Sequence, residues 1–178
     1  MGNPNPDLVG GFINQFSYKN FSLSTLVSFV FGRSLWNGYL SDKLQDAGSS
    51  ALYTTWGTNS AIAGDFKPSD FWMKEGDQTK YPTLFRNTVD NWHIANSTFV
   101  ENASFVRLKN IQLSYTFPQA MMKKLKLKML RIYGVVDNVA VKSWSSVPDP
   151  EAVEANGYST GNGYPIPKKW TIGLDVTF

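Results

Sequence analysis

The residues at the end of the chain alternate between apolar and polar without a break. From Lys168 to Phe178, every even position after the first is apolar, and the odd positions after Lys169 are Thr, Gly, Asp and Thr. Successive side chains of a β-strand point to opposite faces, so this period of two predicts a strand with one apolar face and one polar face. A helix would repeat every 3.6 residues and would not sort the same residues in this way.

Further segments with the same period predict an antiparallel all-β fold. The predicted strands lie near residues 9–18, 21–33, 104–117, 127–139 and 168–178. Lys19-Asn20 reads as a tight turn between the first two strands, and the stretch from Gln119 to Lys126, behind Pro118, predicts a turn or two of helix. Each segment has about ten residues or slightly more, the length that a tilted strand needs to cross a bilayer.

The connections between the predicted strands are short and long in turn. Residues 34–102 and 140–167 carry Gly, Pro, Asn and Asp with no sustained period, and we expect both to be long loops. Such long stretches are unusual inside a compact soluble domain, whereas transmembrane β-barrels place long loops at their outer end. The pattern favours strands of an outer-membrane barrel. The alternative is a soluble β-sandwich that acts as a carbohydrate-binding module, in which the apolar faces would pack together as a core.

The composition fits a sheet that meets something apolar on one face. Charged residues make up only 17% of the chain and aromatic residues 15%, against about 25% charged residues in ordinary soluble proteins. The net charge is +3, and the one dense basic cluster is Lys123, Lys124, Lys126 and Lys128. Nucleic-acid binding would need a broad basic face, so we interpret the cluster as a basic turn. The absence of cysteine excludes disulfides and thiolate metal sites.

Several sequence blocks, in order, are similar to the barrel of one transporter family. They are NPDLVGGFINQFSYKNFSLSTLVSFVFG at 5–32, ENASFVRLKNIQLSYTFP at 101–118, LRIYGVVDN at 130–138, DPE at 149–151 and YPIPKKWTIGLDVTF at 164–178. The blocks resemble the C-terminal end of the SusC/RagA-type TonB-dependent outer-membrane transporters of Bacteroidetes. The loop from Leu35 to Thr98 matches weakly.

The resemblance implies a large barrel with a plug in its lumen, of which this chain would supply about the last five strands without the plug. Five strands cannot close a lumen, since small barrels need about eight. The family imports oligosaccharides or peptides across the cell outer membrane. The implied partners are a SusD-like surface lipoprotein, the rest of the barrel and the plug, TonB through an absent N-terminal region, the lipid bilayer and the barrel-assembly machinery.

The aromatic residues supply most of the candidate contacts. Five loop tryptophans could pin the loops, contact a partner protein or stack on sugar rings; they are Trp36, Trp56, Trp72, Trp92 and Trp144. Trp170, on the apolar face near the outer end of the last strand, suits an aromatic girdle. The resemblance further implies that Phe178 is the terminal aromatic read by the assembly machinery.

The charged candidates are few. The carboxylates of Asp149-Pro150-Glu151 could be calcium ligands, a loop anchor or part of a rigid surface turn. Arg107 and Lys109 interrupt the alternation, and we expect them at the outer rim, where cationic side chains reach headgroups; groups facing the lumen are the alternative. His93 is the only histidine, with no carboxylate cluster beside it. We therefore expect neither a metal site, a cofactor nor an enzyme active site.

Overall fold

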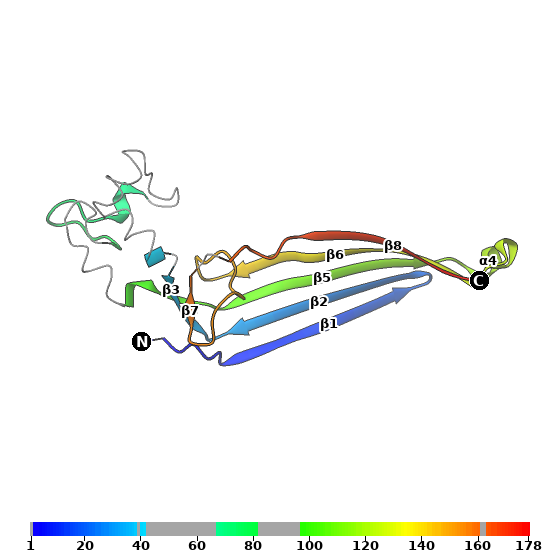
Figure 1. The fold of residues 1–178 in the computed structure, drawn as a ribbon, viewed down its shortest axis with the longest axis horizontal. Helices are drawn as coiled ribbons and strands as arrows, with labels where there is room; N and C mark the ends of the chain where they lie inside the picture. Colours follow the sequence, from blue (N-terminus) through cyan, green and yellow to red (C-terminus); the bar gives the residue numbers. More distant parts are fainter. Residues whose placement is uncertain (1, 39, 42–66, 82–96, 161–162) are drawn as a thin grey trace.

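One antiparallel sheet of long strands is the largest unit in the part of the chain that the structure describes. The computed structural model describes residues 2–38, 40–41, 67–81, 97–160 and 163–178. Its five-stranded sheet has the order β1-β2-β5-β6-β8 (Figure 1). The strands are β1 (Leu8–Tyr18), β2 (Phe21–Phe31), β5 (Phe105–Thr116), β6 (Met129–Ser143) and β8 (Lys169–Thr177). Each long strand pairs antiparallel with the next long strand along the chain, and the sheet does not close, as the sequence predicts.

The short and long connections lie at opposite ends of this sheet (Figure 1). At one end, Lys19 and Asn20 join β1 to β2, and α4 (Gln119–Leu125) lies between β5 and β6. Lys126 ends α4 with a φ of 56°, a left-handed cap whose N–H bonds the carbonyl of Lys123. At the other end lie the long connections 32–104 and 144–168. Among the described residues, no helix is long and apolar enough to cross a membrane.

The two faces of the sheet differ in polarity. Residues paired across an antiparallel ladder share a face, so the series Phe16, Leu23, Leu113, Gly134 and Ile172 marks one side, the apolar face. Ile172 keeps 85% of its surface exposed. The large exposed side chains of this face are Leu8, Phe12, Phe16, Tyr18, Phe21, Leu113, Ile132, Trp170, Ile172, Leu174 and Val176. Exposed apolar surface of this extent marks a face that meets a membrane or a partner.

The opposite side, the polar face, carries mostly hydroxyl, amide and charged groups. The series Gln15, Ser24, Gln112, Val135 and Thr171 runs across it. Asp175 lies on this face, as predicted, and its carboxylate is 3.9 Å from the guanidinium of Arg131. Apolar residues also occur here on the outermost pair of strands, where Val9 and Ile13 lie opposite Val30 and Leu26.

The break in alternation from Arg107 to Lys109 is a β-bulge. The register of β2 against β5 shifts between Leu26 and Val27, and Lys109 has no partner in that pairing. The pairing of β5 with β6 is irregular at the same place, where Asn138 has a φ of 51°. Asn tolerates this left-handed backbone better than most residues. The bulge inserts one extra residue into the strand, and this explains why the alternation of apolar and polar residues is interrupted. The interruption is therefore not evidence that the strand reaches the outer rim at this point.

The long connections, whose sequence shows no sustained period, contain short elements of secondary structure. They contain β3 (Ser34–Asn37), β4 (Val100–Asn102), β7 (Tyr158–Ser159) and the 3-10 helices η1 (Pro68–Asp70) and η2 (Ser97–Phe99). The three short strands form a second sheet of order β4-β3-β7. The buried apolar clusters lie here, with Leu35, Ala103 and Val147 in one and Leu40, Phe71, Tyr81 and Phe99 in the other. Packing in the described chain is thus concentrated at the long-connection end.

Candidate functional site

A buried ion pair joins the sheet to the second long connection. Arg107 of β5 is 3% exposed and donates from Nη2 to Oδ1 of Asp149 at 2.5 Å. Its Nη1 donates to Oδ1 of Asn138, in the bulge of β6, at 2.6 Å. A buried guanidinium is tolerated only where paired charges and hydrogen bonds replace its hydration. Asp149 and Asn138 supply both.

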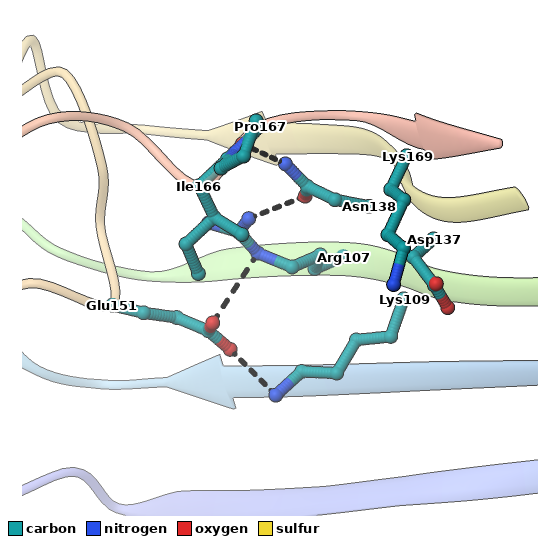
Figure 2. A pocket seen from close by; sticks show the side chains of 8 residues that line it. All are labelled: Arg107, Lys109, Asp137, Asn138, Glu151, Ile166, Pro167 and Lys169. Carbon is teal, nitrogen blue, oxygen red and sulfur yellow. Dashed lines mark hydrogen bonds and ion pairs between the residues drawn. The ribbon is translucent and has the colours of Figure 1, made fainter.

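Glu151 adds a second cation to this network. Its Oε2 lies 3.5 Å from Nε of Arg107, an ion-pair distance too long for a strong hydrogen bond, and its Oε1 lies 3.0 Å from Nζ of Lys109 (Figure 2). Lys109 keeps 42% of its side chain exposed, so its contribution to stability is small beside that of Arg107. The carboxylate therefore bridges a buried cation and a solvated one.

Asp149 also fixes the path of its own loop. Its Oδ1 accepts the backbone N–H of Glu151 at 3.0 Å, and its Oδ2 accepts that of Ile166 at 3.4 Å. Asn138 donates to the carbonyl of Ile166. Both ends of the connection are thereby tied to the sheet. We call Arg107, Asn138, Asp149 and Glu151 the anchor network.

A further arginine holds the same loop from the first long connection. Arg33 donates from Nη2 to the carbonyl of Pro150 at 2.6 Å. Burial lowers the pKa of Arg33 from its ordinary value, and the nearby Glu151 carboxylate opposes this effect. Arginine remains charged at neutral pH in such a setting. The loop between Asp149 and Glu151 is thus held by cations from strand β5 and from the first long connection.

A cavity of about 340 Å³ opens beside the anchor network (Figure 2). Its lining residues are Arg107, Lys109, Asp137, Asn138, Glu151, Ile166, Pro167 and Lys169. Cations and carboxylates both face it, and Asn110 donates to Oδ1 of Asp137 at 2.6 Å. None of these lining side chains is aromatic. Charged groups of both signs thus border a cavity whose surface is mainly apolar.

A second hollow of about 320 Å³ lies on the polar face nearer the short connections. Its polar lining consists of Gln15, Ser17, Ser22, Ser24, Gln112, Ser114 and Arg131. Hydroxyl and amide groups donate and accept hydrogen bonds without adding charge. The polar face thus offers a charged cavity at one end and a mainly neutral hollow towards the other.

The two long connections are bonded to each other. Asn37 of β3 is fully buried and donates to Oε1 of Glu101 at 3.2 Å and to Oγ of Ser146 at 2.9 Å. The backbone N–H of Ser146 donates to Oε2 of Glu101 at 2.7 Å. Parallel pairing of β3 with β7 adds a backbone link. The described parts of both connections therefore form one bonded unit.

The predicted loop tryptophans have different surroundings. Trp36 stacks on Tyr158 with ring centroids 5.1 Å apart and meets Phe99 edge-on at 5.8 Å, the geometry of a residue that pins the loops. Trp144 is half exposed, with its ring 6.0 Å from that of Phe31. Trp72 is 41% exposed in the first connection. Trp56, Trp92 and His93 lie outside the described residues.

The two strand-end aromatics lie on opposite ends of β8. Trp170 is 74% exposed on the apolar face, at the end of the strand that meets the long connection. Phe178 is 79% exposed and follows β8 at the end where the short connections lie (Figure 1). Their positions are compatible with the predicted girdle and assembly roles, which stay predictions.

The structure corrects two expectations about the charged residues. Arg107 is not at a solvated rim, because it is buried and bound to Asp149. Asp149 and Pro150 are buried too, so the surface-turn interpretation is wrong. The carboxylates of Asp149 and Glu151 contact cationic side chains, and no group of three potential metal ligands occurs in the part of the chain that the structure describes.

Sequence reasoning did not find Arg33, Asn138 or the Asn37–Glu101–Ser146 bonds. Asn138 follows Asp137 within a strand pattern, and this strand-breaking pair was a usable signal for the bulge. No local signal marks the others, since their partners lie 45 to 117 residues away.

The chain is similar over its whole length to part of several large receptors. No family model matches it. It is 32% identical over 183 residues to TonB-dependent receptor P39 of Formosa agariphila and 28% identical over 187 residues to TonB-dependent receptor P26 of the same organism. These alignments cover the entire chain but only 17% and 18% of the respective relatives. The chain thus spans about a sixth of their length.

Solved structures show the same fold. The RagAB peptide importer in its open-open state superimposes with a TM-score of 0.72 at 21% identity, over 99% of this chain and 18% of that chain. The RagAB peptide transporter gives a TM-score of 0.72 at 22% identity. The chain is thus similar in sequence to part of TonB-dependent receptors, and it shares its fold with part of the RagAB importer.

Proposed function

We propose that the chain forms part of the wall and outer loops of an outer-membrane, TonB-dependent importer of oligosaccharides or peptides. One observation carries the proposal: the sheet separates an exposed apolar face from a polar face, with both long connections at the same end. An antiparallel sheet that lines a barrel needs this division, because lipid meets one side and the lumen the other. The receptor and importer relatives support the same interpretation.

In this proposal, each part of the chain lies in a different environment. The apolar face lies against lipid, the polar face lines the lumen around a plug, and the long connections face the cell exterior. Trp170 then lies in the outer aromatic girdle, and we propose that Phe178 is the aromatic that the barrel-assembly machinery reads. TonB acts through an N-terminal region of the whole receptor.

The bonded long connections suit a partner at the outer mouth. We propose a SusD-like surface lipoprotein, consistent with the two-letter RagAB designation of the structural neighbours. The anchor network and the Asn37–Glu101–Ser146 bonds hold both connections in one arrangement. A partner would thus meet a surface ordered in advance, which lowers the entropy lost on association.

Within this function, the charged cavity favours peptides over neutral sugars as the solutes contacted there. Lys169 and Asp137 border it with opposite charges, and none of its lining side chains is aromatic. Peptide termini and side chains carry charges that such groups bind, whereas sugar recognition commonly uses aromatic faces. The neutral hollow nearer the short connections fits either solute.

A soluble β-sandwich is less well supported. A sandwich requires a second sheet packed on the apolar face. In the described parts of the chain, the second sheet is built from short strands of the long connections, and the apolar face keeps residues such as Ile172 and Trp170 exposed.

The test is uptake by cells that lack the receptor containing this segment. Labelled peptide and oligosaccharide pools would be supplied to the deletion strain, the complemented strain and the complemented strain treated with an uncoupler. We expect uptake of at least one pool to require both the receptor and an energised inner membrane. Equal uptake by all three cultures would contradict the proposal. Replacing Asp137 with Asn and Lys169 with Gln should lower peptide uptake more than oligosaccharide uptake.

A further inference from the structure

The turn that contains α4 carries positive charge without a counter-charge. Its lysines are Lys123, Lys124, Lys126 and Lys128, and all of them are exposed. No acidic residue occurs between Glu101 and Asp137. Within the described part of the chain, none of these ammonium groups forms an ion pair. The cluster therefore presents an uncompensated cationic surface at the short-connection end.

The same turn also exposes apolar side chains. Met121 and Leu125 are 50% and 57% exposed, and their spacing of four places them on one side of α4. Met122 is 2% exposed and holds the helix to the rest of the turn. Exposed apolar side chains beside lysines are typical of helices that lie in the headgroup region of a bilayer.

A group of aromatic rings lies where the sheet meets this turn. Phe21 and Tyr115 have ring centroids 4.7 Å apart, and Tyr115 and Phe117 have centroids 5.1 Å apart. Tyr18, at the end of β1, is 72% exposed beside Phe21 on the apolar face. Tyrosine and other aromatics gather at the level of the lipid headgroups. α4 begins at Gln119, directly after Phe117 and Pro118. Its lysines therefore come immediately after these aromatic rings along the chain.

We propose that α4 and the following lysines bind the anionic phospholipid headgroups of the leaflet at the short-connection end, with Met121 and Leu125 inserted between the lipids. This inference rests on the proposed barrel function, which places the apolar face in a bilayer. The charge is complementary to a phosphatidylglycerol surface, and the exposed apolar pair can enter the bilayer beside it. A lysine close to an anionic surface changes affinity by about fivefold, and salt weakens the effect. The contact would fix the depth of this part of the wall.

The experiment uses the full-length receptor in nanodiscs of phosphatidylcholine with phosphatidylglycerol. This segment contributes no cysteine, and any cysteine elsewhere in the receptor is replaced, so that one cysteine at Leu125 carries an environment-sensitive fluorophore. Quenching is measured with doxyl-labelled phosphatidylglycerol and, separately, with doxyl-labelled phosphatidylcholine. The same label at Ile172 reports whether the apolar face is in lipid, and a label at Met73 reports the long connection.

We expect lipid quenching at Leu125, stronger with phosphatidylglycerol than with phosphatidylcholine at equal mole fraction. K123Q/K124Q should lower this preference severalfold, up to about fivefold for each lysine. The matched variant K67Q/K74Q removes two exposed lysines from the first long connection and should leave the preference unchanged.

Three results would overturn the inference. Quenching at Ile172 without quenching at Leu125 would support the barrel placement but contradict the lipid contact of α4. In that case, a blue-shifted emission of the label at Leu125 would show that protein covers α4 instead. An equal response to the two lipids, or no effect of K123Q/K124Q, removes the headgroup preference. Absence of quenching at Ile172 contradicts the proposed barrel placement and the inference together.

Discussion

Asp149→Asn removes the charge that partners Arg107 and leaves the shape of the side chain intact. The guanidinium of Arg107 and the carboxylate of Asp149 are 3% and 5% exposed, so neither charge is well hydrated. Breaking a buried pair by removing one partner typically costs about 3–5 kcal/mol. Glu151, 3.5 Å from Nε of Arg107, still offsets part of the lost interaction. We therefore expect the low end of that range, about 3 kcal/mol.

A loss of about 3 kcal/mol corresponds to a roughly 100-fold rise in local opening, since about 1.4 kcal/mol is tenfold. Opening should free the backbone N–H groups of Glu151 and Ile166, which bond the Asp149 carboxylate. The measurement is hydrogen exchange by mass spectrometry on peptides that cover 149–167 in the full-length receptor. Exchange in β8 should change little, because its ladder bonds do not involve Asp149.

Asp175→Asn is the matched control. Its pair with Arg131 spans 3.9 Å, and the two side chains are 44% and 35% exposed. An exposed pair is worth about 0–1 kcal/mol, so exchange should rise by less than about fivefold. R107M/D149N, which also removes the unpaired buried cation and keeps a side-chain oxygen at position 149, should recover part of the protection lost in D149N. Equal, small effects of D149N and D175N would refute the reasoning.

Other predictions concern the sheet, the loops and the chain end. In Gly173→Val, the new Cβ would overlap the ring of Tyr133, so we expect less heat-resistant folded receptor on gels and a recovery when Tyr133→Ala is added. Trp36→Ala removes the ring that stacks on Tyr158 and should cost about 3 kcal/mol in the loops, seen as faster proteolysis there with unchanged heat resistance of the barrel; uniform protease resistance would contradict its pinning role. Deleting Phe178 should lower the amount of receptor in outer-membrane fractions, and unchanged amounts would contradict its role as assembly signal.

The sheet was predictable because each strand carries its own signal. The alternation from Trp170 to Val176 is complete in the sequence and reappears as alternating exposure in β8. The helix behind Pro118 was predictable for a local reason too, since proline suits the start of a helix. In both cases the residues that decide the structure are neighbours along the chain.

The anchor network was not predictable, because its parts are distant in sequence. Arg107 and Asp149 are separated by 42 residues, and Arg33 lies 117 residues before Pro150. The face of the sheet to which Lys109 belongs could not be predicted either. One inserted residue breaks the alternation in the same way as an irregular strand end does. Sequence blocks similar to the family pointed to 149–151 without showing what the carboxylates contact.

The central claim is that the sheet divides lipid from an aqueous lumen. Single cysteines at positions 170 to 176 of β8, in full-length receptor in nanodiscs, would be tested against a doxyl-labelled lipid and a water-soluble thiol reagent. The account predicts lipid quenching at Trp170, Ile172 and Leu174 and greater aqueous reactivity at Thr171 and Asp175. Uniform reactivity along the strand, or aqueous reactivity at Ile172 without lipid quenching, would contradict it.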